Sequence, residues 1–305
     1  MEKFEVTILG CGSAVPFEKY MTTSQLVNVH DELFMVDCGE GMQTQIWSSK
    51  IKVTRLNHIF ISHMHGDHFF GLVPFLSSLG LMLNRTTDMH LYLPEKMVNA
   101  IESDLQNYCE LPYKVIIHSV DTTIKTVLYE DKTMLVESIP LDHRVPCCGF
   151  LFKEKPKENV LLPAKCKEYG VPVSAYRDVK AGNDFVREDG TVVPNSLLTS
   201  PNSFVPRSYA FCSDTAYLPE MVEQIKNVNL LYHEATFLKS ESEQAAANGH
   251  STAEQAAQIA KEANAKQLAI GHYSIRYDDI NQLVDEAKAT FPNTVACEKG
   301  MVFSL

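Results

Sequence analysis

Three histidines and one aspartate crowd into six residues of the stretch FISHMHGDH, which follows an apolar run. His63 and His65 are two residues apart at the end of a predicted strand, so their side chains point to one side. Asp67 and His68 lie on the turn beyond, and Gly66 lets the chain turn tightly between the two pairs. Imidazole nitrogens and carboxylate oxygens are ligands that zinc prefers in proteins. The stretch therefore predicts a metal site at the end of a buried strand.

Further candidate ligands also follow predicted strands. His143 comes after LVESIPLD, Asp214 after YAFCS and His272 after LAIG. In layered α/β folds the loops at one sheet edge converge, and sites are built there. Each of these residues alone is more often structural or solvated, but together with the first cluster they complete two metal sites. Four other histidines lack such a setting and are expected to be structural or on the surface: His30, His58, His90 and His118.

Short β-like runs alternate with helical patterns along the chain, which predicts an α/β fold. The predicted strands are residues 4–9, 25–29, 33–36, 58–61, 114–120, 134–139, 208–212, 229–232 and 267–270. The predicted helices are residues 69–82, 95–108, 253–264 and 278–289.

One segment, from about Phe152 to Pro206, is rich in Pro, Gly, Asn and charge and has little periodicity. We expect it to form an inserted, flexible arm within a single domain of residues 1–305. From Leu151 to Arg187 the chain has eight Lys and Arg against five Asp and Glu, which gives +3. Because the whole chain carries −11, the remainder carries −14. That charge argues against a protein that grips nucleic acid over its whole surface, whereas a basic arm allows local contact with phosphates.

Composition predicts an ordinary soluble protein of the cytosol. The 305 residues are 45% hydrophobic and 21% charged, enough to bury one large core or two modest ones. The eight cysteines form no CxxC pair and lie mostly in apolar contexts, which is typical of reduced thiols. The start, MEKFEVTILGCG, has no signal-peptide features, and we expect no apolar run long enough to span a membrane.

The set HxHxDH, then DHRVP, SDT and the last candidate histidine, resembles the metallo-β-lactamase superfamily over nearly the whole chain. This resemblance implies an αββα four-layer sandwich, in which two sheets pack between helical layers. Finer motifs are similar to the ribonuclease Z family of tRNA 3′-processing endonucleases: LGCGSAVP, DCGEGMQTQ, HEATF, GHSTAEQAAQIAKEAN and GHYSIRY. HxHxDH alone indicates only the superfamily, whereas the last three motifs are much more specific.

The resemblance implies how the ligands divide between two zinc ions, with manganese as the alternative metal. One ion would take His63, His65 and His143, the other Asp67, His68 and His272, and Asp214 would bridge them. Asp37, in the DCGEG turn, is expected to orient a ligand histidine. Its alternative role is that of a simple turn residue before glycine.

Two such ions, about 3.5–4 Å apart, can share a water, lower its pKa towards about 7 and clamp the oxygens of a phosphoryl displacement. Asp67 would orient this water and accept its proton. The leaving ribose 3′-oxygen needs a proton, and His250 and Glu234 are the candidates to supply it. His250 directly precedes a predicted capping box, Ser251 with Glu254, at the positive end of a helix, which disfavours imidazolium. Glu234 would hold the acid form; the alternative is that His250 merely packs at the helix start.

Arg276, in SIRY, is a phosphate-binding candidate near His272. This chain has Tyr20 and Thr44 where the family has arginine, so these two positions are not expected to bind RNA. It also has Ser213 directly before Asp214, where the family usually has glycine.

Three functions stay open at this point. The resemblance implies a zinc-dependent endoribonuclease that removes the 3′ trailer from precursor tRNA and leaves a tRNA 3′-hydroxyl and a trailer 5′-phosphate. It also implies a homodimer in which one subunit's arm holds RNA on the other's active site. The alternatives are a metallohydrolase of small phosphodiesters, lactones or thioesters, and a catalytically silent RNA-binding module. The basic arm favours RNA, because a small substrate needs no arm.

Overall fold

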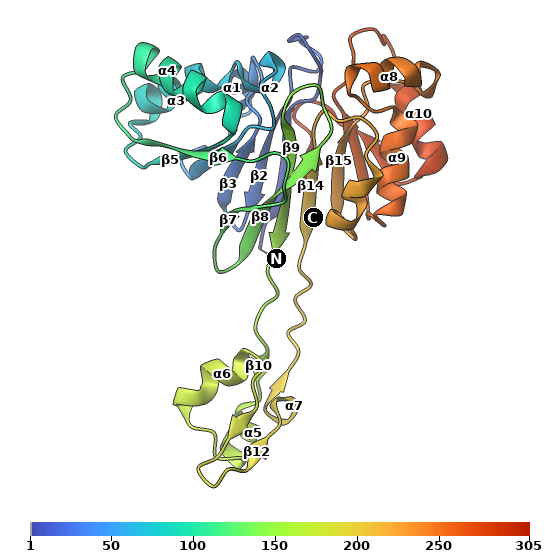
Figure 1. The fold of residues 1–305 in the computed structure, drawn as a ribbon. Helices are drawn as coiled ribbons and strands as arrows, with labels where there is room; N and C mark the ends of the chain where they lie inside the picture. Colours follow the sequence, from blue (N-terminus) through green and yellow to red (C-terminus); the bar gives the residue numbers. More distant parts are fainter. Residues whose placement is uncertain (1) are drawn as a thin grey trace. The chain divides into compact units, whose positions relative to one another are not determined.

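The computed structural model describes residues 2–305 and divides them into two compact units. The larger unit contains the chain up to Glu130, residues 135–153 and residues 207–305. The smaller unit contains residues 131–134 and 154–206. In the larger unit, two seven-stranded sheets lie between helical layers, which is the predicted layer order (Figure 1).

The first sheet mixes antiparallel and parallel pairing. Its order is β18-β1-β2-β3-β4-β5-β6, antiparallel from β18 to β3 and parallel from β3 to β6. Runs such as ELFMV in β3 are almost wholly apolar because strands in a sheet that is covered on both faces bury both sets of side chains. The strands are β1 (Phe4–Gly10), β2 (Ser24–Val29), β3 (Glu32–Val36), β4 (Leu56–Phe60), β5 (Met89–Pro94), β6 (Val115–Val120) and β18 (Val302–Ser304).

The second sheet has the order β17-β16-β15-β14-β9-β8-β7. Strands β14 to β17 are parallel, and β9 runs antiparallel to β14. Its strands are β7 (Val127–Glu130), β8 (Met134–Leu141), β9 (Cys147–Glu154), β14 (Ser208–Cys212), β15 (Leu230–Glu234), β16 (Leu268–Gly271) and β17 (Thr294–Ala296). Aromatic rings join the two sheets: Phe60 of β4 lies 5.3 Å from Phe150 and 5.9 Å from Phe152 of β9, between ring centroids.

Helices cover the outer faces of both sheets. α1, α3 and α4 lie over the first sheet and α8, α9 and α10 over the second (Figure 1). α3 buries Leu72, Phe75, Leu76 and Leu79, spaced i, i+3, i+4 and i+7, so one stripe of the helix faces the core. The helices are α1 (Met42–Ser48), α2 (Gly66–Phe69), α3 (Leu72–Leu83), α4 (Val98–Tyr108), α8 (Ser242–Asn248), α9 (Ala253–Glu262) and α10 (Asn281–Thr290). Short 3₁₀ turns are η1 (Glu95–Met97), η3 (Pro219–Gln224) and η4 (Lys239–Glu241).

Several elements were not predicted, among them β5, β9, α1 and α8. β9, with the sequence CCGFLFKE, is buried at seven of its eight positions and therefore lacks the alternation that identifies a half-buried strand. Phe152, the expected start of the arm, lies within β9 opposite Tyr209. The longer segment of the smaller unit begins at Glu154.

The smaller unit has its own core and is not structureless. Its elements are β10 (Val160–Leu161), α5 (Pro163–Glu168), η2 (Val173–Ala175), α6 (Tyr176–Lys180), β11 (Phe185–Val186), β12 (Val192–Val193), α7 (Asn195–Leu198) and β13 (Thr199–Ser200). Its buried cluster consists of Cys166, Val171, Val179, Val193 and Leu198.

The net charge of the smaller unit is zero, because residues 131–134 and 154–206 contain eight Lys and Arg and eight Asp and Glu. The count of +3 from the sequence depended on its boundaries. Lys153 belongs to the larger unit, whereas Asp131, Lys132, Glu188 and Asp189 belong to the smaller one.

One helical stretch corrects the expectation that no apolar run is long enough to span a membrane. Gly66–Leu83 meets that criterion by length and mean hydropathy, with 18 residues at 1.2. It contains Asp67 and His68 and packs the apolar stripe of α3 against the first sheet, as the core helix of a globular unit does.

Candidate active site

The predicted ligands come together at the carboxyl ends of strands from both sheets. β4 leads into the loop with His63 and His65, and β8 leads to His143. β14 leads to Asp214, and β16 to His272. Because β14, β15 and β16 are parallel, their carboxyl ends lie at one edge of the second sheet. Asp214 and His272 therefore lie opposite the loop that follows β4 of the first sheet.

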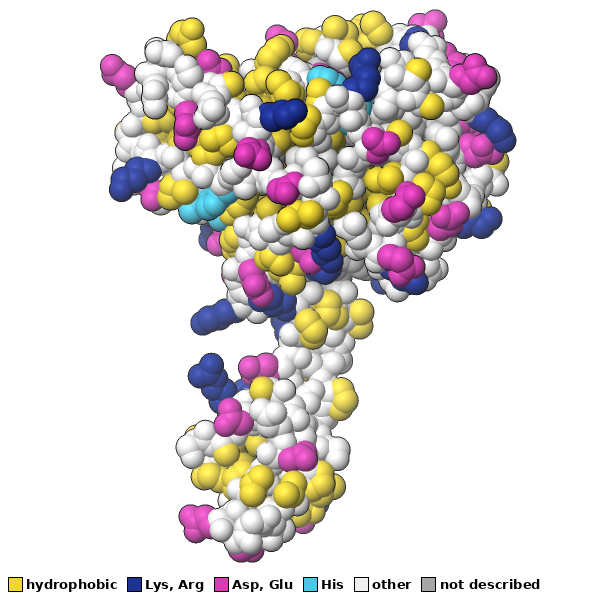
Figure 2. Space-filling view, in the orientation of Figure 1, with side chains coloured by type: hydrophobic (Ala, Val, Ile, Leu, Met, Phe, Trp, Pro, Cys, Tyr) yellow, Lys and Arg dark blue, Asp and Glu magenta, His cyan; other side chains and the backbone are white. Residues whose placement is uncertain are grey.

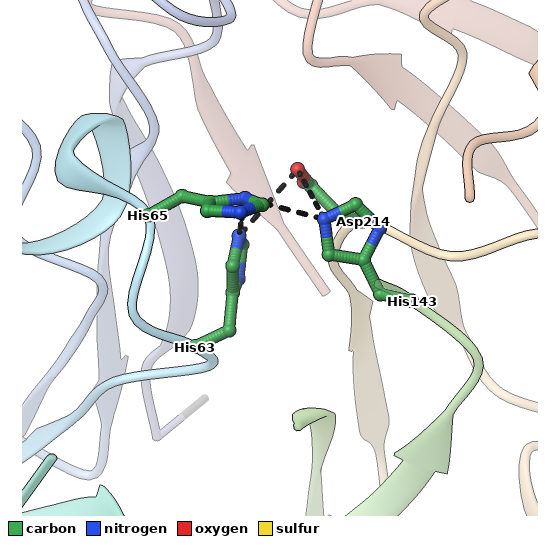
Figure 3. Close-up of side chains that lie close together, drawn as sticks. All are labelled: His63, His65, His143 and Asp214. Atoms are coloured by element: carbon green, nitrogen blue, oxygen red, sulfur yellow. Dashed lines mark hydrogen bonds and ion pairs between the residues drawn. The ribbon is translucent and has the colours of Figure 1, made fainter. Parts of the chain in front are cut away.

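The first set of donor atoms contains three imidazoles. His65 Nδ1 lies 3.1 Å from His63 Nε2 and 3.2 Å from His143 Nε2. Oδ2 of Asp214 lies 3.6 Å from His63 Nε2 and 3.9 Å from His143 Nε2. The rings turn their nitrogens toward a common point beside the carboxylate (Figure 3). These four atoms could hold one metal ion.

The second set uses the other oxygen of the same aspartate. Asp214 Oδ1 lies 3.3 Å from His68 Nε2 and 3.3 Å from His272 Nε2, and the two nitrogens are 3.3 Å apart. Asp67 Oδ2 completes the set at 3.4 Å from His272 Nε2 and 3.7 Å from His68 Nε2. Asp214 thus presents one oxygen to each set, as the predicted bridging role requires.

Asp37 contacts a histidine of the second set and is fully buried. Its carboxylate accepts from His68 Nδ1 at 2.7 Å and from the Ser62 backbone N–H at 2.7 Å and hydroxyl at 2.9 Å. Ser62 Oγ in turn lies 3.0 Å from His63 Nδ1. The contact with His68 is the one predicted for Asp37, while sequence reasoning missed Ser62.

Gly249 and Thr236 orient two further imidazoles, and neither residue was singled out from the sequence. His143 Nδ1 donates to the Gly249 carbonyl at 2.7 Å, and a Cβ on Gly249 would lie 2.9 Å from that nitrogen. Gly249 also has a positive φ of 69°, so glycine suits this turn on two grounds. Thr236 Oγ1 lies 2.9 Å from His272 Nδ1, and the HEATF motif was the one available signal for it.

The protonation pattern makes the site suited to a cation. His68 Nδ1 faces a carboxylate and His143 Nδ1 faces a carbonyl, so both nitrogens carry hydrogen; in a neutral ring, Nε2 would then turn its lone pair toward Asp214. A lone pair facing a carboxylate is repulsive unless a proton or a metal ion lies between them. Burial lowers the pKa of His68, but Asp214 and Asp37 outweigh this effect and raise it well above its usual range. The donor set of nitrogen and carboxylate oxygen fits a divalent transition metal.

Buried Glu234 and half-buried His250 form a pair beside the second set. Glu234 Oε1 accepts from His250 Nδ1 at 2.8 Å, and the carboxylate also accepts from the backbone N–H groups of Thr215, Thr236 and Ser251. Burial opposes the charge on His250, but the Glu234 carboxylate raises the pKa of His250 to about 9. The pair therefore holds His250 as imidazolium with Nε2 not engaged by Glu234.

The predicted capping box was wrong by one residue. The helix after His250 is capped by Thr252, whose side chain accepts from the Gln255 N–H, and Gln255 reaches back to the Thr252 N–H. Ser251 Oγ donates instead to the Thr215 carbonyl at 2.8 Å. Because Ser251 is taken up by this tertiary contact, the cap moves to the next hydroxyl residue.

Arg276 is already occupied by an acidic partner. Its Nη1 lies 2.7 Å from Glu241 Oε1 and 3.3 Å from Gln244 Oε1, and its guanidinium lies 4.7 Å from the centre of the Phe237 ring. A phosphate would have to compete with Glu241 for this guanidinium.

The three positions that depart from the family have ordinary structural roles. Tyr20 is buried and packs edge-on against Tyr273, Thr44 is exposed on α1, and Ser213 Oγ lies 3.1 Å from Ser62 Oγ.

The histidines expected to be structural lie outside these donor sets. His58, His90 and His118 stack along neighbouring strands β4, β5 and β6, with centroids 4.9 and 5.2 Å apart. His90 Nδ1 lies 2.9 Å from His118 Nε2. His30 pairs with Glu2 at 3.6 Å.

The fold and the donor groups define a metal-dependent hydrolase of the β-lactamase superfamily. Models of two families match the chain: the anti-Pycsar protein Apyc1 over residues 4–154, and the β-lactamase superfamily domain over residues 203–273. Ribonuclease Z of Bacteroides fragilis (strain YCH46) is 50% identical over 306 aligned positions, and that of Porphyromonas gingivalis (strain W83) is 45% identical, each covering 100% of both chains. The chain belongs to the ribonuclease Z family.

A solved structure supports the same assignment. The crystal structure of human tRNase Z, short form, superposes with a TM-score of 0.72 at 25% identity and covers 98% of each chain. The comparisons confirm the predicted family and the predicted fold class.

Proposed function

We propose that this enzyme is an endoribonuclease that removes the 3′ trailer from precursor tRNA, leaving a 3′-hydroxyl on the tRNA and a 5′-phosphate on the trailer. The observation that carries the proposal is Asp214, which presents one carboxylate oxygen to each of two converging donor sets. Family membership supports the RNA substrate, because the relatives that span the full chain are ribonucleases Z.

Two zinc ions, with manganese as the alternative, would be held by these sets. His63, His65 and His143 would hold one, Asp67, His68 and His272 the other, and Asp214 both. When bound, such ions supply Lewis acidity and lower the pKa of water. The second imidazole nitrogen of four of the five histidines is engaged by Ser62, Asp37, Gly249 or Thr236, which keeps the coordinating nitrogen aimed inward.

Asp67 orients the attacking water and accepts its proton. Its Oδ2 accepts from the Ala14 backbone N–H at 2.7 Å, which fixes the carboxylate at the edge of the second set. Burial raises the pKa of Asp67, but His272 and His68 hold it below its usual range, so the carboxylate is ionised and able to accept. The water oxygen bonds to phosphorus as the bond from phosphorus to the ribose 3′-oxygen breaks.

His250 supplies the proton that the departing 3′-oxygen needs. Its Nδ1 is held by Glu234, so Nε2–H is the donor toward substrate. Glu234 stays ionised because five hydrogen-bond donors surround it, and its charge keeps His250 protonated. Asp67 as base and His250 as acid give the two proton transfers that hydrolysis requires.

The smaller unit would contact the RNA as an arm. Its net charge is zero. α5 and α6 expose the cations Lys165, Lys167, Arg177 and Lys180 beside the acids Glu168 and Asp178, and Lys165 pairs with Glu168 at 2.8 Å. Glu188 and Asp189 lie on the turn between β11 and β12, and Figure 2 shows side chains of both charges on this unit. Basic side chains on two short helices support contacts with phosphates, which position RNA without reading its sequence.

We also infer a homodimer in the cytoplasm. α3 exposes Leu81 at 79% and Met82 at 61%, an apolar surface of the kind that a second subunit covers. All eight cysteines are free, which suits a reducing compartment.

Cleavage of a defined precursor tRNA by metal-loaded protein tests the proposal. We expect a cut that leaves the two predicted ends, identified by ligation of the trailer 5′-phosphate and extension of the tRNA 3′-hydroxyl. A small chromogenic phosphodiester serves as the comparison substrate. If the protein hydrolysed that diester, a lactone or a thioester but did not cleave precursor tRNA, the proposed function would be wrong and the protein would be a hydrolase of small substrates.

A further inference from the structure

Arg144 is an exposed cation beside the first donor set. It directly follows His143, in the turn between β8 and β9. Its guanidinium makes one long hydrogen bond, 3.4 Å from Nη1 to Asn248 Oδ1. Among residues 2–305, no carboxylate forms an ion pair with it. The mechanism described above does not use this charge.

The surrounding loops place Arg144 at the rim of the site. The Gly249 carbonyl binds His143, and a Cβ on Gly249 would lie 3.3 Å from the Arg144 backbone nitrogen, so the two loops are in close contact. Asn248 is itself fixed, because its Nδ2 donates to the Gln244 carbonyl at 2.9 Å. The Arg144 guanidinium therefore lies near Asn248 and keeps most of its N–H donors free.

The contrast with Arg276 decides which arginine is available to an anion. Arg276 lies 2.7 Å from a carboxylate oxygen of Glu241, which neutralises its charge. Arg144 lacks such a partner and makes only the long hydrogen bond to Asn248.

We propose that Arg144 binds a backbone phosphate of the RNA strand next to the scissile linkage. The inference rests on the proposed RNA cleavage and adds a positioning residue to it. Arginine presents a planar fork of N–H donors that matches two phosphate oxygens. Arg144 is exposed and lies outside the two sets of metal-binding groups. It therefore contacts a flanking phosphate rather than the scissile one. Such a contact sets the register of the strand over the metal-binding groups.

Arg144→Gln tests this contact, with Arg55→Gln as the matched control. Arg55 is also exposed and in the larger unit, but it precedes β4, at the opposite end of that strand from the ligands. We expect Arg144→Gln to lower kcat/KM for precursor tRNA by about tenfold or more, the usual worth of a charged hydrogen bond. Arg144→Lys should recover part of the loss. Metal content and hydrolysis of the small diester should match wild type in all three variants.

Precursor tRNAs with one neutral methylphosphonate linkage at a time, on either side of the cleavage site, identify the phosphate. At the contacted linkage, neutralisation should slow wild type about as much as Arg144→Gln does and should slow Arg144→Gln no further. If neutralisation lowered kcat/KM equally in wild type and in Arg144→Gln at every linkage, the proposed contact would be wrong. Loss of metal from Arg144→Gln would also contradict it. If wild type cleaves no precursor tRNA, the proposed function itself fails; if wild type cleaves and Arg144→Gln behaves like Arg55→Gln, only this inference fails.

Discussion

Single atoms decide how this site can work, and Thr236 Oγ1 is an example. It has one hydrogen and lies 2.7 Å from Glu234 Oε2 and 2.9 Å from His272 Nδ1. If the hydroxyl donates to the carboxylate, it accepts from His272 Nδ1–H, and the lone pair of His272 Nε2 then faces Asp214. One threonine thus links the proposed acid pair to a proposed metal ligand. His272 also adopts a left-handed φ of 61°, which is uncommon outside glycine.

Thr236→Val should weaken metal binding, because valine keeps the shape but removes the hydroxyl that orients His272. We expect metal affinity to fall by about 10- to 100-fold, the usual effect of losing such a partner. Competition with a chelator of known affinity measures it. Thr44→Val, at an exposed position on α1, is the control. Unchanged affinity in Thr236→Val would remove the hydroxyl from the orienting role.

His250→Ala should slow cleavage by about 10² to 10⁴, the usual range for general acid catalysis, with metal content unchanged. The pKa of His250 is raised to about 9, so the active acid form is present at neutral pH and is lost as the pH rises toward that value. Wild type should therefore lose activity at alkaline pH, and His250→Ala should lack that limb. A rate close to wild type would leave His250 with only a packing role.

Glu234→Gln is a second test of the pair formed by Glu234 and His250. It removes the charge that raises the pKa of His250, so the alkaline loss of activity should move to lower pH. A pH–rate profile whose alkaline limb stays in place would show that Glu234 does not control the acid.

At the scale of elements, the C-terminal ends of strands do most of the positioning. The parallel pairs β3–β4 and β14–β15–β16 bring Asp37, the HxHxDH loop, Asp214, Glu234 and His272 to corresponding sheet edges. The smaller unit follows a different principle, because its short helices and strands surround a core of only five buried apolar side chains. Because the smaller unit has a core of its own, its proposed RNA contact can be tested independently of bond cleavage.

The exposed cations of α5 and α6 test the proposed arm. Changing Lys165, Lys167, Arg177 and Lys180 to Gln should lower kcat/KM for precursor tRNA by about tenfold or more and flatten its salt dependence, because phosphate contacts are lost. The matched control changes Glu188 and Asp189, on the β11–β12 turn, to Gln and Asn. Hydrolysis of the small diester should be unchanged in both. The proposed RNA contact by α5 and α6 would be wrong if the fourfold variant behaved like the control.

At the scale of the whole molecule, the site joins the two sheets. The loop after β4 in the first sheet supplies four candidate ligands, and the second sheet supplies His143, Asp214 and His272. Any ion bound there connects both halves of the sandwich. Ligands that bind only the folded state stabilise it by mass action.

Purified protein should therefore hold close to two transition-metal ions per chain, as counted by elemental analysis. Chelation should abolish activity, and zinc or manganese should restore it. Removing the metal should also lower the unfolding temperature, by roughly 10 °C if free metal exceeds its Kd about a thousandfold. Calorimetry before and after chelation measures this shift. Full activity in metal-free protein would contradict the two-ion mechanism.

The sequence by itself predicted the groups of the candidate site, because these residues lie in short motifs whose spacing is local. HxHxDH, the strand-end positions of His143, Asp214 and His272, and the HEATF and GHST motifs predicted the donor set and the acid pair. Asp37 was expected to orient a candidate ligand histidine, and its carboxylate lies 2.7 Å from His68 Nδ1.

Only the tertiary structure decided how those groups are held. His68 and His272 are 204 residues apart in sequence, and Gly249 is 106 residues from the imidazole that it orients. Such contacts depend on how two sheets pack, which no local pattern encodes. The same packing moved the helix cap from Ser251 to Thr252 and gave Arg276 a carboxylate partner. The boundary of the smaller unit, and with it a net charge of zero, also follows from which side chains share a core, a property of the folded chain alone.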